Sequence, residues 1–436
     1  MRRRLSPYER VIWAAGERLP VNIAAVARVE GRTTPGRVRA AVESVRRRHP
    51  LLGVRIADPG PWQGRLTTAG VPDPGVRVVP DAGAGAWSRV VEEELQRPFD
   101  TRTGPLARFV LLDAGEAFDL VTVYHHLVAD AVSAGVVMRD LLTHLGGPDP
   151  AGTPLPGPAR PPGTHRGAAA DAADASGAGP VPGPVPVPVL AAPADELIPG
   201  PRAHPGDLLR TARAVGGPVR PPYPPDGRLA YRAWSLEREE TELLLKRCRA
   251  QGATLQAALC AAFARAAAPG RPARIAVAAD LRRVLEPSPG EAMGLYAASF
   301  VVPVDGGTDD LWAAARDARA GIHARLTPEE LRPLVRVFRL TSFLPHRAVG
   351  ALLRRGETRG PRFDVSVSNT RLDLPGTYGP LRLAAVHGAA HTSLSGAPLV
   401  IVVGLGGRLF LSVTSTAGEE AADLCRRAME HLLSAE

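Results

Sequence analysis

The stretch YHHLVAD, residues 124–130, joins an apolar run to a helical pattern, and the interpretation of the whole chain starts from it. The preceding residues 118–126 (FDLVTVYHH) are rich in β-branched and aromatic side chains, which is typical of a buried strand. After Asp130, apolar side chains recur at the spacing of an amphipathic helix. The sequence therefore predicts a strand that ends in two histidines and a helix whose N-cap is Asp130.

The two histidines, His125 and His126, are predicted to have different surroundings. Side chains alternate between the two faces of a strand, so these rings point in opposite directions and cannot easily bind one metal ion together. One ring is expected to face a cavity, where a neutral imidazole can act as a general base. The other is expected to pack or hydrogen-bond behind the sheet. The competing interpretation is that both histidines are structural and that Asp130 is only a helix cap.

Composition narrows the possible functions. The 436 residues are enough for two domains of ordinary size. The net charge is +9, and all the basic side chains except Lys246 are arginines, histidine being counted as neutral. Basic residues are dense only at 2–4 and 46–48, and aromatic residues make up 5% of the chain. A nucleic-acid-binding protein usually has a concentrated basic patch or a recognisable module, so we expect no nucleic-acid partner.

Cysteine usage and hydropathy indicate a cytoplasmic protein. Cys248, Cys260 and Cys425 have the spacing of neither a disulfide framework nor a zinc site, and reduced thiols are the simplest interpretation. No run approaches the ~20 apolar residues that cross a bilayer, so we expect no membrane span. The basic N-terminus lacks the uninterrupted apolar core of a signal peptide.

A segment rich in proline, glycine and alanine divides the chain. Residues 1–145 are predicted to form an N-terminal half that carries the two histidines. Residues 146–225 are predicted to be a linker that is extended and largely mobile over its stretch 156–193 and contains a short helix around 208–214. Residues 226–436 are predicted to form a C-terminal half. Strands and helices mix without strict alternation, which predicts an α/β fold in the loose sense, or α+β.

Several short motifs together resemble those of condensation-type acyltransferases, and they occur in the order of that family over nearly the whole chain. They are LSPYERVIW at 5–13, RHPLL at 48–52, HHLVAD at 125–130, DLR at 280–282, MGLY at 293–296 and SVSN at 366–369. The family includes condensation domains of nonribosomal peptide synthetases, polyketide-associated acyltransferases and wax ester synthases. The length of the chain and its Ser-Asn strand are most similar to the polyketide-associated group.

The resemblance implies a fold and an activity. The fold would consist of two halves, each resembling chloramphenicol acetyltransferase, arranged as a V around a central tunnel. The activity would move an acyl group from coenzyme A (CoA) or an acyl carrier protein to a small-molecule alcohol or amine, in polyketide or nonribosomal peptide biosynthesis. No cofactor would be bound permanently, because the donor is the thioester of CoA or phosphopantetheine.

The resemblance also implies roles for particular residues. His126 would be the general base, or the group that orients the acceptor. No metal site is implied. The structural residues at the site would be His125, Asp130 and Arg282, the last as the partner of Asp130, and the substrate-binding residues would be Ser368 and Asn369.

Two departures from the family pattern leave alternatives open. The usual glycine after the aspartate is Ala131, and the DFGWG loop that links the halves in relatives is replaced by LDLPGTYGPLRL at 372–383. These departures permit a catalytically degenerate module that recruits a carrier protein. A third hypothesis is a cyclase or dehydratase that acts on a tethered intermediate.

Two further histidines, His387 and His391, bracket a Gly-Ala-Ala sequence that we interpret as a turn in a polar loop. The alternative interpretation is that they line the tunnel, together with the hydroxyl side chains of Thr392, Ser393 and Ser395.

Overall fold

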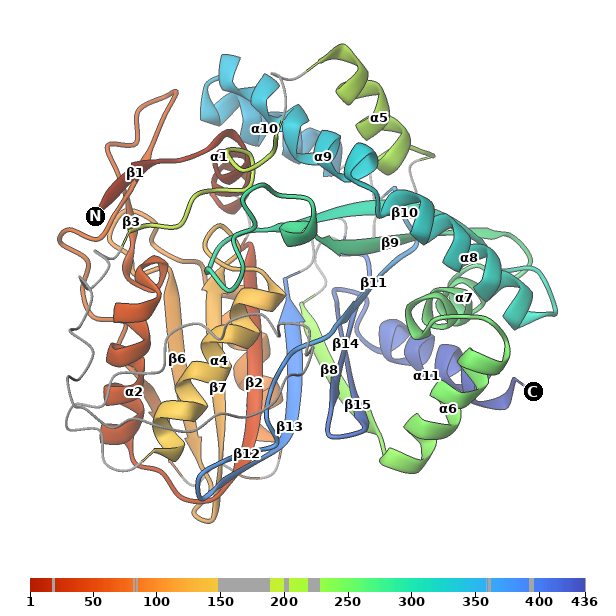
Figure 1. Ribbon diagram of the computed structural model, residues 1–436, viewed down its shortest axis with the longest axis horizontal. Coiled ribbons are helices and arrows are strands. Elements are labelled where there is room, and N and C mark those ends of the chain that lie inside the picture. Colours follow the sequence, from red (N-terminus) through yellow and green to blue (C-terminus); the bar gives the residue numbers. More distant parts are fainter. Residues whose placement is uncertain are drawn as a thin grey trace, which may run out of the picture.

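The computed structural model describes residues 1–17, 20–80, 83, 85–147, 189–199, 204–218, 228–357, 359, 362–391 and 396–435. Within these residues, two six-stranded sheets stand side by side and each is covered by helices (Figure 1). The arrangement is the mixed α/β architecture that the sequence predicts, with antiparallel pairs in both sheets and parallel pairs in a minority.

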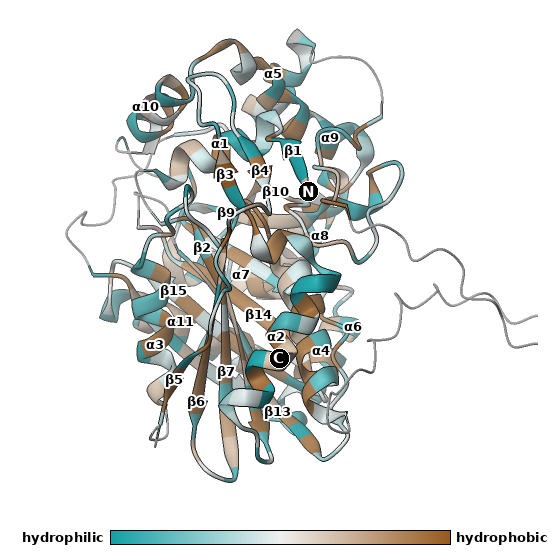
Figure 2. Ribbon diagram, turned by 90° about the vertical axis from the view of Figure 1, so that its left-hand side faces the viewer, coloured by the Kyte–Doolittle hydropathy of each residue, from teal (hydrophilic) through white to brown (hydrophobic). Residues whose placement is uncertain are grey.

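The first sheet has the strand order β12-β13-β2-β7-β6-β5. Its strands are β12 (Thr377–Tyr378), β13 (Leu381–Ala390), β2 (Asn22–Glu30), β7 (Ala117–His125), β6 (Ala107–Asp113) and β5 (Arg77–Val79). Helices α2 (Pro35–Arg48) and α4 (Ala131–Gly146) cover one face, and α3 (Ala86–Gln96) covers the other (Figure 2). Strand β7 and helix α4 confirm the strand predicted at 118–126 and the helix predicted after Asp130.

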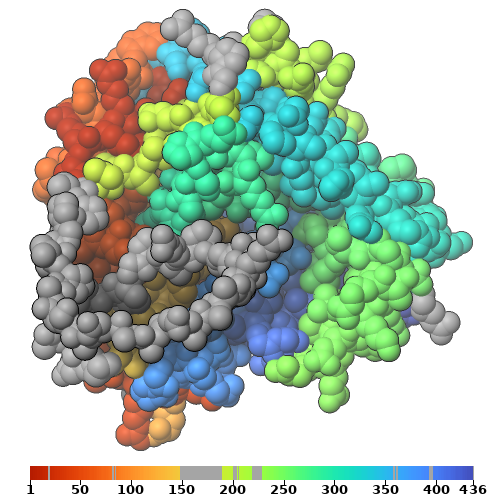
Figure 3. Space-filling view, viewed as in Figure 1, coloured from red at the N-terminus to blue at the C-terminus, as the bar shows by residue number. Residues whose placement is uncertain are grey.

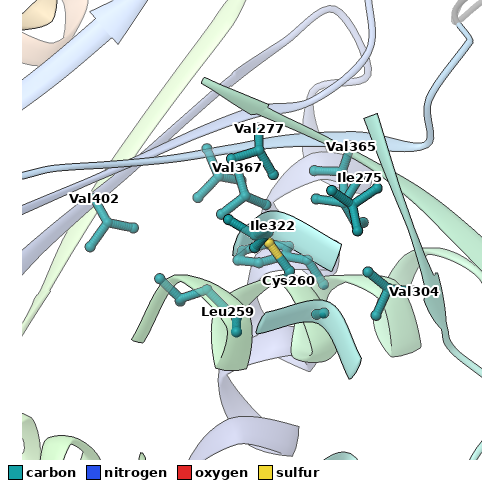
Figure 4. Packing of buried hydrophobic residues seen from close by; sticks show 14 of the residues in the cluster. Leu259, Cys260, Ile275, Val277, Val304, Ile322, Val365, Val367 and Val402 are labelled. Atoms are coloured by element: carbon teal, nitrogen blue, oxygen red, sulfur yellow. The ribbon is translucent and has the colours of Figure 1, made fainter. Parts of the chain in front are cut away.

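The second sheet has the strand order β10-β9-β11-β14-β15-β8. Its strands are β10 (Ala297–Asp305), β9 (Pro272–Asp280), β11 (Val365–Thr370), β14 (Leu399–Leu405), β15 (Arg408–Ser415) and β8 (Ala230–Leu236). Helices α7 (Leu255–Ala267), α8 (Leu311–Arg325) and α11 (Glu419–Ser434) cover its core face. Figure 4 shows Val367 and Val402 in this core, near Leu259 and Cys260 of α7. The alternate residues of β11 and β14 therefore face the other half of the molecule.

The remaining elements lie around these two layers. They are the small sheet of β1 (Arg2–Arg4), β4 (Arg65–Thr67) and β3 (Arg55–Ala57), and the helices α1 (Pro7–Gly16), α5 (Pro205–Val215), α6 (Arg238–Ala250), α9 (Pro328–Arg336) and α10 (His346–Glu357). Helix α5 confirms the short helix predicted around 208–214.

Part of the predicted linker is built into the fold. Ala194, Asp195 and Ile198 are buried, and α5 packs against α9. Residues 189–199 and 204–218 of the predicted linker therefore pack on the rest of the protein, because their apolar side chains cover part of its surface. The rest of the Pro-rich segment lies outside the described residues, and the division into domains stays a prediction.

The two sheets do not separate at the linker, because a C-terminal strand completes the N-terminal sheet. Strand β13 pairs antiparallel with β2. Along the outer edge of β13, the hydroxyl of Ser412 donates to the Gly388 carbonyl at 2.6 Å, and the hydroxyl of Thr414 donates to the Ala390 carbonyl at 2.7 Å. Side-chain hydroxyls of β15 thus satisfy edge carbonyls that would otherwise lack a partner where the sheets meet.

The segment that crosses between the halves packs tightly on α4. A Cβ atom on Gly135 would lie 2.6 Å from Leu372, and one on Gly146 would lie 2.1 Å from the carbonyl oxygen of Tyr378. In Figure 3, blue atoms of the C-terminal half lie beside ochre atoms of the N-terminal half. The LDLPGTYGPLRL sequence therefore couples the halves, although it lacks the DFGWG motif.

This close approach predicts that Gly146→Ala destabilises the protein. The new methyl group would overlap the backbone of Tyr378, and overpacking of this kind typically costs about 1–3 kcal/mol. Gly36→Ala in α2 is the matched control, because its Cβ would meet only Thr34 Oγ1 at 3.8 Å. The free energy of unfolding in urea should fall for Gly146→Ala and should not fall for Gly36→Ala. Equal stability of the two variants would mean that the crossing segment does not depend on this contact.

Candidate active site

The turn after β7 fixes the orientation and the tautomer of His126. Its backbone N–H donates to the Val21 carbonyl at 2.8 Å, and its ring Nδ1 lies 2.8 Å from the Ala129 carbonyl oxygen. A carbonyl oxygen can only accept a hydrogen bond, so Nδ1 carries the proton and Nε2 of the neutral ring carries the lone pair. Such a ring can accept a proton through Nε2 without changing its position.

His125 lies on the other face of the strand, as the alternation of side chains predicts. It is buried, its Nδ1 accepts from the Leu127 N–H at 3.2 Å, and its ring meets Phe99 edge-on. Burial, together with the nearby charges of His126 and Arg108, lowers the pKa of His125 to about 3. The ring is therefore neutral and supports the turn from behind.

Asp130 and Arg282 form a buried, bidentate ion pair between the two halves. The two Asp130 oxygens accept from the Arg282 guanidinium at 2.8 and 3.2 Å. Asp130 also caps α4 by accepting from the Ser133 N–H at 2.7 Å, and it accepts from the Tyr296 N–H at 2.9 Å. Burial lowers the pKa of Arg282, but the charges of Asp130 and Asp280 outweigh that effect and hold it above its usual value.

Ser133 is a site residue that the sequence analysis missed. Its hydroxyl donates to the Gly294 carbonyl at 2.9 Å, and it accepts from the Gly294 N–H at 3.1 Å and from Arg282 at 3.0 Å. The MGLY motif thereby docks on the first turn of α4. Spacing offered one signal, because a residue three positions after an N-cap lies one turn along the helix, beside the capping side chain.

The RHPLL motif contacts the same helix further along. His49 Nε2 lies 2.7 Å from a carboxylate oxygen of Asp140, and both side chains are buried. The neighbouring Arg139 donates both guanidinium nitrogens to Glu291 at 2.7 Å. Helix α4 therefore makes polar contacts with the end of α2 and with the loop between β9 and β10.

A cavity of about 250 Å³ opens between the halves, and His126 lines it. Alternate residues of two neighbouring strands form its floor in register, with each hydroxyl of β11 beside an aliphatic side chain of β14. The pairs are Ser366 with Leu399, Ser368 with Ile401, and Thr370 with Val403. A row of hydroxyl groups therefore runs beside an apolar row in the same cavity as the imidazole.

The two residues of the predicted substrate-binding pair lie on opposite faces of β11. Ser368 lines the His126 cavity, whereas Asn369 is exposed and lines an adjoining cavity of about 270 Å³. The exposed Arg283 and Arg371 also line the adjoining cavity. The two cavities share part of their walls, because both are lined by residues at the N-terminus of α4 and on three strands of the second sheet. The shared residues are Asp130, Ala131, Ala278, Ala297, Ser368 and Thr370.

The backbone at Ala131 does not need glycine. Among the described residues other than glycine, only Asp58 has a positive φ, so Ala131 lies in ordinary helical backbone. Its side chain is exposed and lines both cavities. The alanine adds a methyl group to the cavity wall and leaves the turn intact.

The expectation of a turn at His387 and His391 is wrong, because β13 continues to Ala390 and both histidines line the cavity. The ring of His387 stacks on Trp87 at 4.8 Å and meets Phe410 edge-on. Burial lowers the pKa of His387 to about 4, with a smaller contribution from the charge of Arg408. The neighbouring hydroxyl residues 392–395 lie outside the described residues.

The described residues contain no group of three or more His, Cys, Asp or Glu side chains that could hold a metal ion. The three cysteines are free and buried. In the described part of the chain, none of the helices is long and apolar enough to cross a bilayer.

Part of the chain is similar in sequence to proteins of a known family. Residues 17–145 match the family model named Condensation domain. Phosphinothricin tripeptide synthetase PhsC of Streptomyces viridochromogenes is 36% identical over 130 residues, which are 28% of this chain and 12% of that protein. The chain thus matches only a small part of the length of this curated relative.

Two solved structures extend the likeness to the whole fold. Trichothecene 15-O-acetyltransferase TRI3 from Fusarium sporotrichioides has a TM-score of 0.71 at 12% identity, covering 99% of this chain and 94% of its own. A mutant of the starter condensation domain of rhizomide synthetase, in complex with C8-CoA, has a TM-score of 0.64 at 14% identity and the same two coverages. The chain has the fold of condensation domains, and its residues 17–145 match the sequence model of that family.

Arg282→Ala should be strongly destabilising. Loss of the guanidinium leaves the Asp130 carboxylate buried without its partner, which typically costs about 3–5 kcal/mol. Arg283→Ala is the matched control, because the adjacent arginine is exposed. Urea unfolding should separate the two variants clearly. In a double-mutant cycle, Asp130→Asn combined with Arg282→Ala should cost less than the sum of the single changes; an additive result would contradict the pairing.

The buried neutral His125 predicts a loss of stability in acid. Its pKa of about 3 in the fold lies below the ~6.5 of an unfolded chain, so the unfolded chain binds the proton first as the pH falls. Its contribution is complete above pH ~6.5 and lost progressively towards pH 3, with about 2 kcal/mol gone at about pH 5. The free energy of unfolding of His125→Asn should therefore fall less between about pH 7.5 and about pH 5 than that of the wild type. The exposed His323→Asn should keep the wild-type slope.

Proposed function

We propose that this protein is an acyltransferase that moves an acyl group from a thioester of CoA or of a carrier protein to an alcohol or amine, in natural-product biosynthesis. The observation that carries the proposal is the hydrogen bond from Nδ1 of His126 to the Ala129 carbonyl. It leaves Nε2 as the basic nitrogen of a ring that lines a cavity between the halves. A positioned general base of this kind is what an acceptor hydroxyl needs before it can attack a thioester.

The chain's residues can carry out the reaction in two proton transfers. The acceptor O–H or N–H gives its proton to His126 Nε2 as the oxygen or nitrogen bonds to the thioester carbonyl carbon. When the tetrahedral intermediate collapses, the C–S bond breaks and the imidazolium returns the proton to the leaving thiolate. The products are an ester or amide and a free thiol. The Ala129 carbonyl supports the imidazolium between these steps, because it accepts from Nδ1–H in both protonation states.

The adjoining cavity supports a phosphate-bearing donor. CoA and phosphopantetheine both carry a phosphate group at the far end of the pantetheine arm. Two exposed arginines, Arg283 and Arg371, line the cavity that shares part of its wall with the His126 cavity. Guanidinium groups bind phosphate with charge-assisted hydrogen bonds, so a donor could enter by this route with its thioester towards His126.

Two departures from the family pattern motivated the carrier-recruiting hypothesis, and neither disturbs the site in the expected way. Ala131 leaves the turn intact, and the crossing segment packs on α4 at both Gly135 and Gly146. The cyclase or dehydratase hypothesis would use the same imidazole, and product mass separates it from acyl transfer. A transferase product combines the masses of acyl group and acceptor, whereas a cyclised or dehydrated product has the mass of one substrate or is lighter by water.

His126→Ala should reduce the rate of acyl transfer by about 10²–10⁴-fold, the usual contribution of a general base. His323→Ala, at an exposed position on α8, is the control for loss of an imidazole elsewhere. The measurement is the release of free thiol from acyl thioesters with a panel of alcohols and amines, with thermal unfolding to show that both variants are folded. Activity of folded His126→Ala within a few-fold of the wild type would reject the proposal.

A further inference from the structure

Gly388 of β13 and Ile401 of β14 approach each other closely across the cavity. Both residues line the cavity and both are half-buried. A Cβ atom on Gly388 would lie 2.8 Å from Ile401 Cγ2 and 3.6 Å from its Cδ1, so a methyl group here would have to displace the isoleucine. The two residues come from different sheets, and their spacing sets the width of the cavity at this point.

The approach is held by a hydrogen bond, so it cannot widen freely. Ser412 lies directly opposite Ile401 in the β14–β15 ladder. Its hydroxyl donates to the Gly388 carbonyl at 2.6 Å. The same small area of the second sheet thus anchors the backbone of Gly388 and presents the isoleucine side chain to it.

The floor of the cavity has a polar row and an apolar row of side chains, which run side by side along two strands. The hydroxyl row of β11 suits the polar parts of the reactants, and the aliphatic row of β14 suits an apolar chain. Ile401 is the middle residue of that aliphatic row, between Leu399 and Val403. Gly388 lies against it, and Ala25, the partner of Gly388 in the β13–β2 ladder, is also small, so Ile401 faces a part of the wall that carries no large side chain.

The contact between Ile401 and Gly388 limits what can occupy this space. The cavity has a volume of about 250 Å³, and a chain that follows the aliphatic row meets this contact.

We propose that Ile401, held against Gly388, sets the length of the acyl group that this protein accepts, and that the acyl group is a short aliphatic chain. This inference rests on the proposed acyl transfer and names its substrate class. A chain that lies along the aliphatic row extends until it meets the isoleucine, and longer chains lose affinity because they must displace it.

The test is equilibrium binding of a series of saturated acyl thioesters, from acetyl-CoA to dodecanoyl-CoA, and of the corresponding acyl-pantetheines. Binding needs no acceptor and no turnover. In the wild type, each added methylene should tighten binding up to about fourfold while the cavity fills, and affinity should then stop rising at a short chain. Ile401→Ala removes three side-chain carbons and should move this limit to chains longer by about two or three carbons.

A second variant, on the opposite side of the same contact, should have the opposite effect on the length limit. Gly388→Ala should move the limit to shorter chains, because its methyl group overlaps Ile401. The double variant Gly388→Ala with Ile401→Ala should return the limit towards that of the wild type. Val402→Ala is the matched control on the same strand, because Val402 faces the core instead of the cavity (Figure 4). It should lower stability and leave the length limit unchanged.

Each outcome decides a different point. If the wild type binds acyl thioesters and Ile401→Ala has the same length limit, the assignment of Ile401 is wrong and the proposed acyl transfer is untouched. If no thioester of either series binds the wild type, the inference and the proposed donor both fail. A limit that moves equally in Ile401→Ala and Val402→Ala would show a general loosening of the sheet and would also overturn the assignment.

Discussion

The buried ion pair of Asp130 and Arg282 is the constraint on which the rest of the site depends. Two charges are removed from water at the junction of the halves, and this is tolerable only because every oxygen of the carboxylate has a donor. One of those donors is the first turn of α4 and another is the backbone of Tyr296. The pair therefore positions a helix of the first half and a loop of the second half relative to each other. Because Asp130 ends the turn after β7, its contacts with Arg282 and Tyr296 place that turn at the boundary between the halves.

The chemistry of His126 follows from that turn. The chain from His126 to Asp130 is short, so fixing the aspartate fixes the carbonyl of Ala129, which in turn selects the tautomer of the ring. His125 supports the turn from the opposite face and remains neutral because it is buried. The proposed general base thus owes its tautomer to backbone geometry.

The cavity itself belongs to neither half alone. Strand β13 leaves the second half, pairs with β2 of the first, and meets the face of β14 and β15 along its outer edge. The close packing of Leu372 on Gly135 and of Tyr378 on Gly146 brings the crossing segment down on α4. The crossing segment therefore couples the halves, because small residues on α4 allow the backbones to approach.

The sequence by itself determined the local structure: the strand ending at His125, the cap at Asp130 and the opposite directions of the two histidines all follow from side-chain alternation and helix capping. Resemblance of motifs added the partner Arg282, which lies 152 residues further along the chain. Only the tertiary structure decided that Ser368 shares the cavity with His126 while Asn369 does not, that His387 lies in a strand instead of a turn, and that Ser133 joins the halves. These facts depend on which strands pair and in which register. Pairing is decided by contacts between distant segments, and no local pattern in the sequence encodes it.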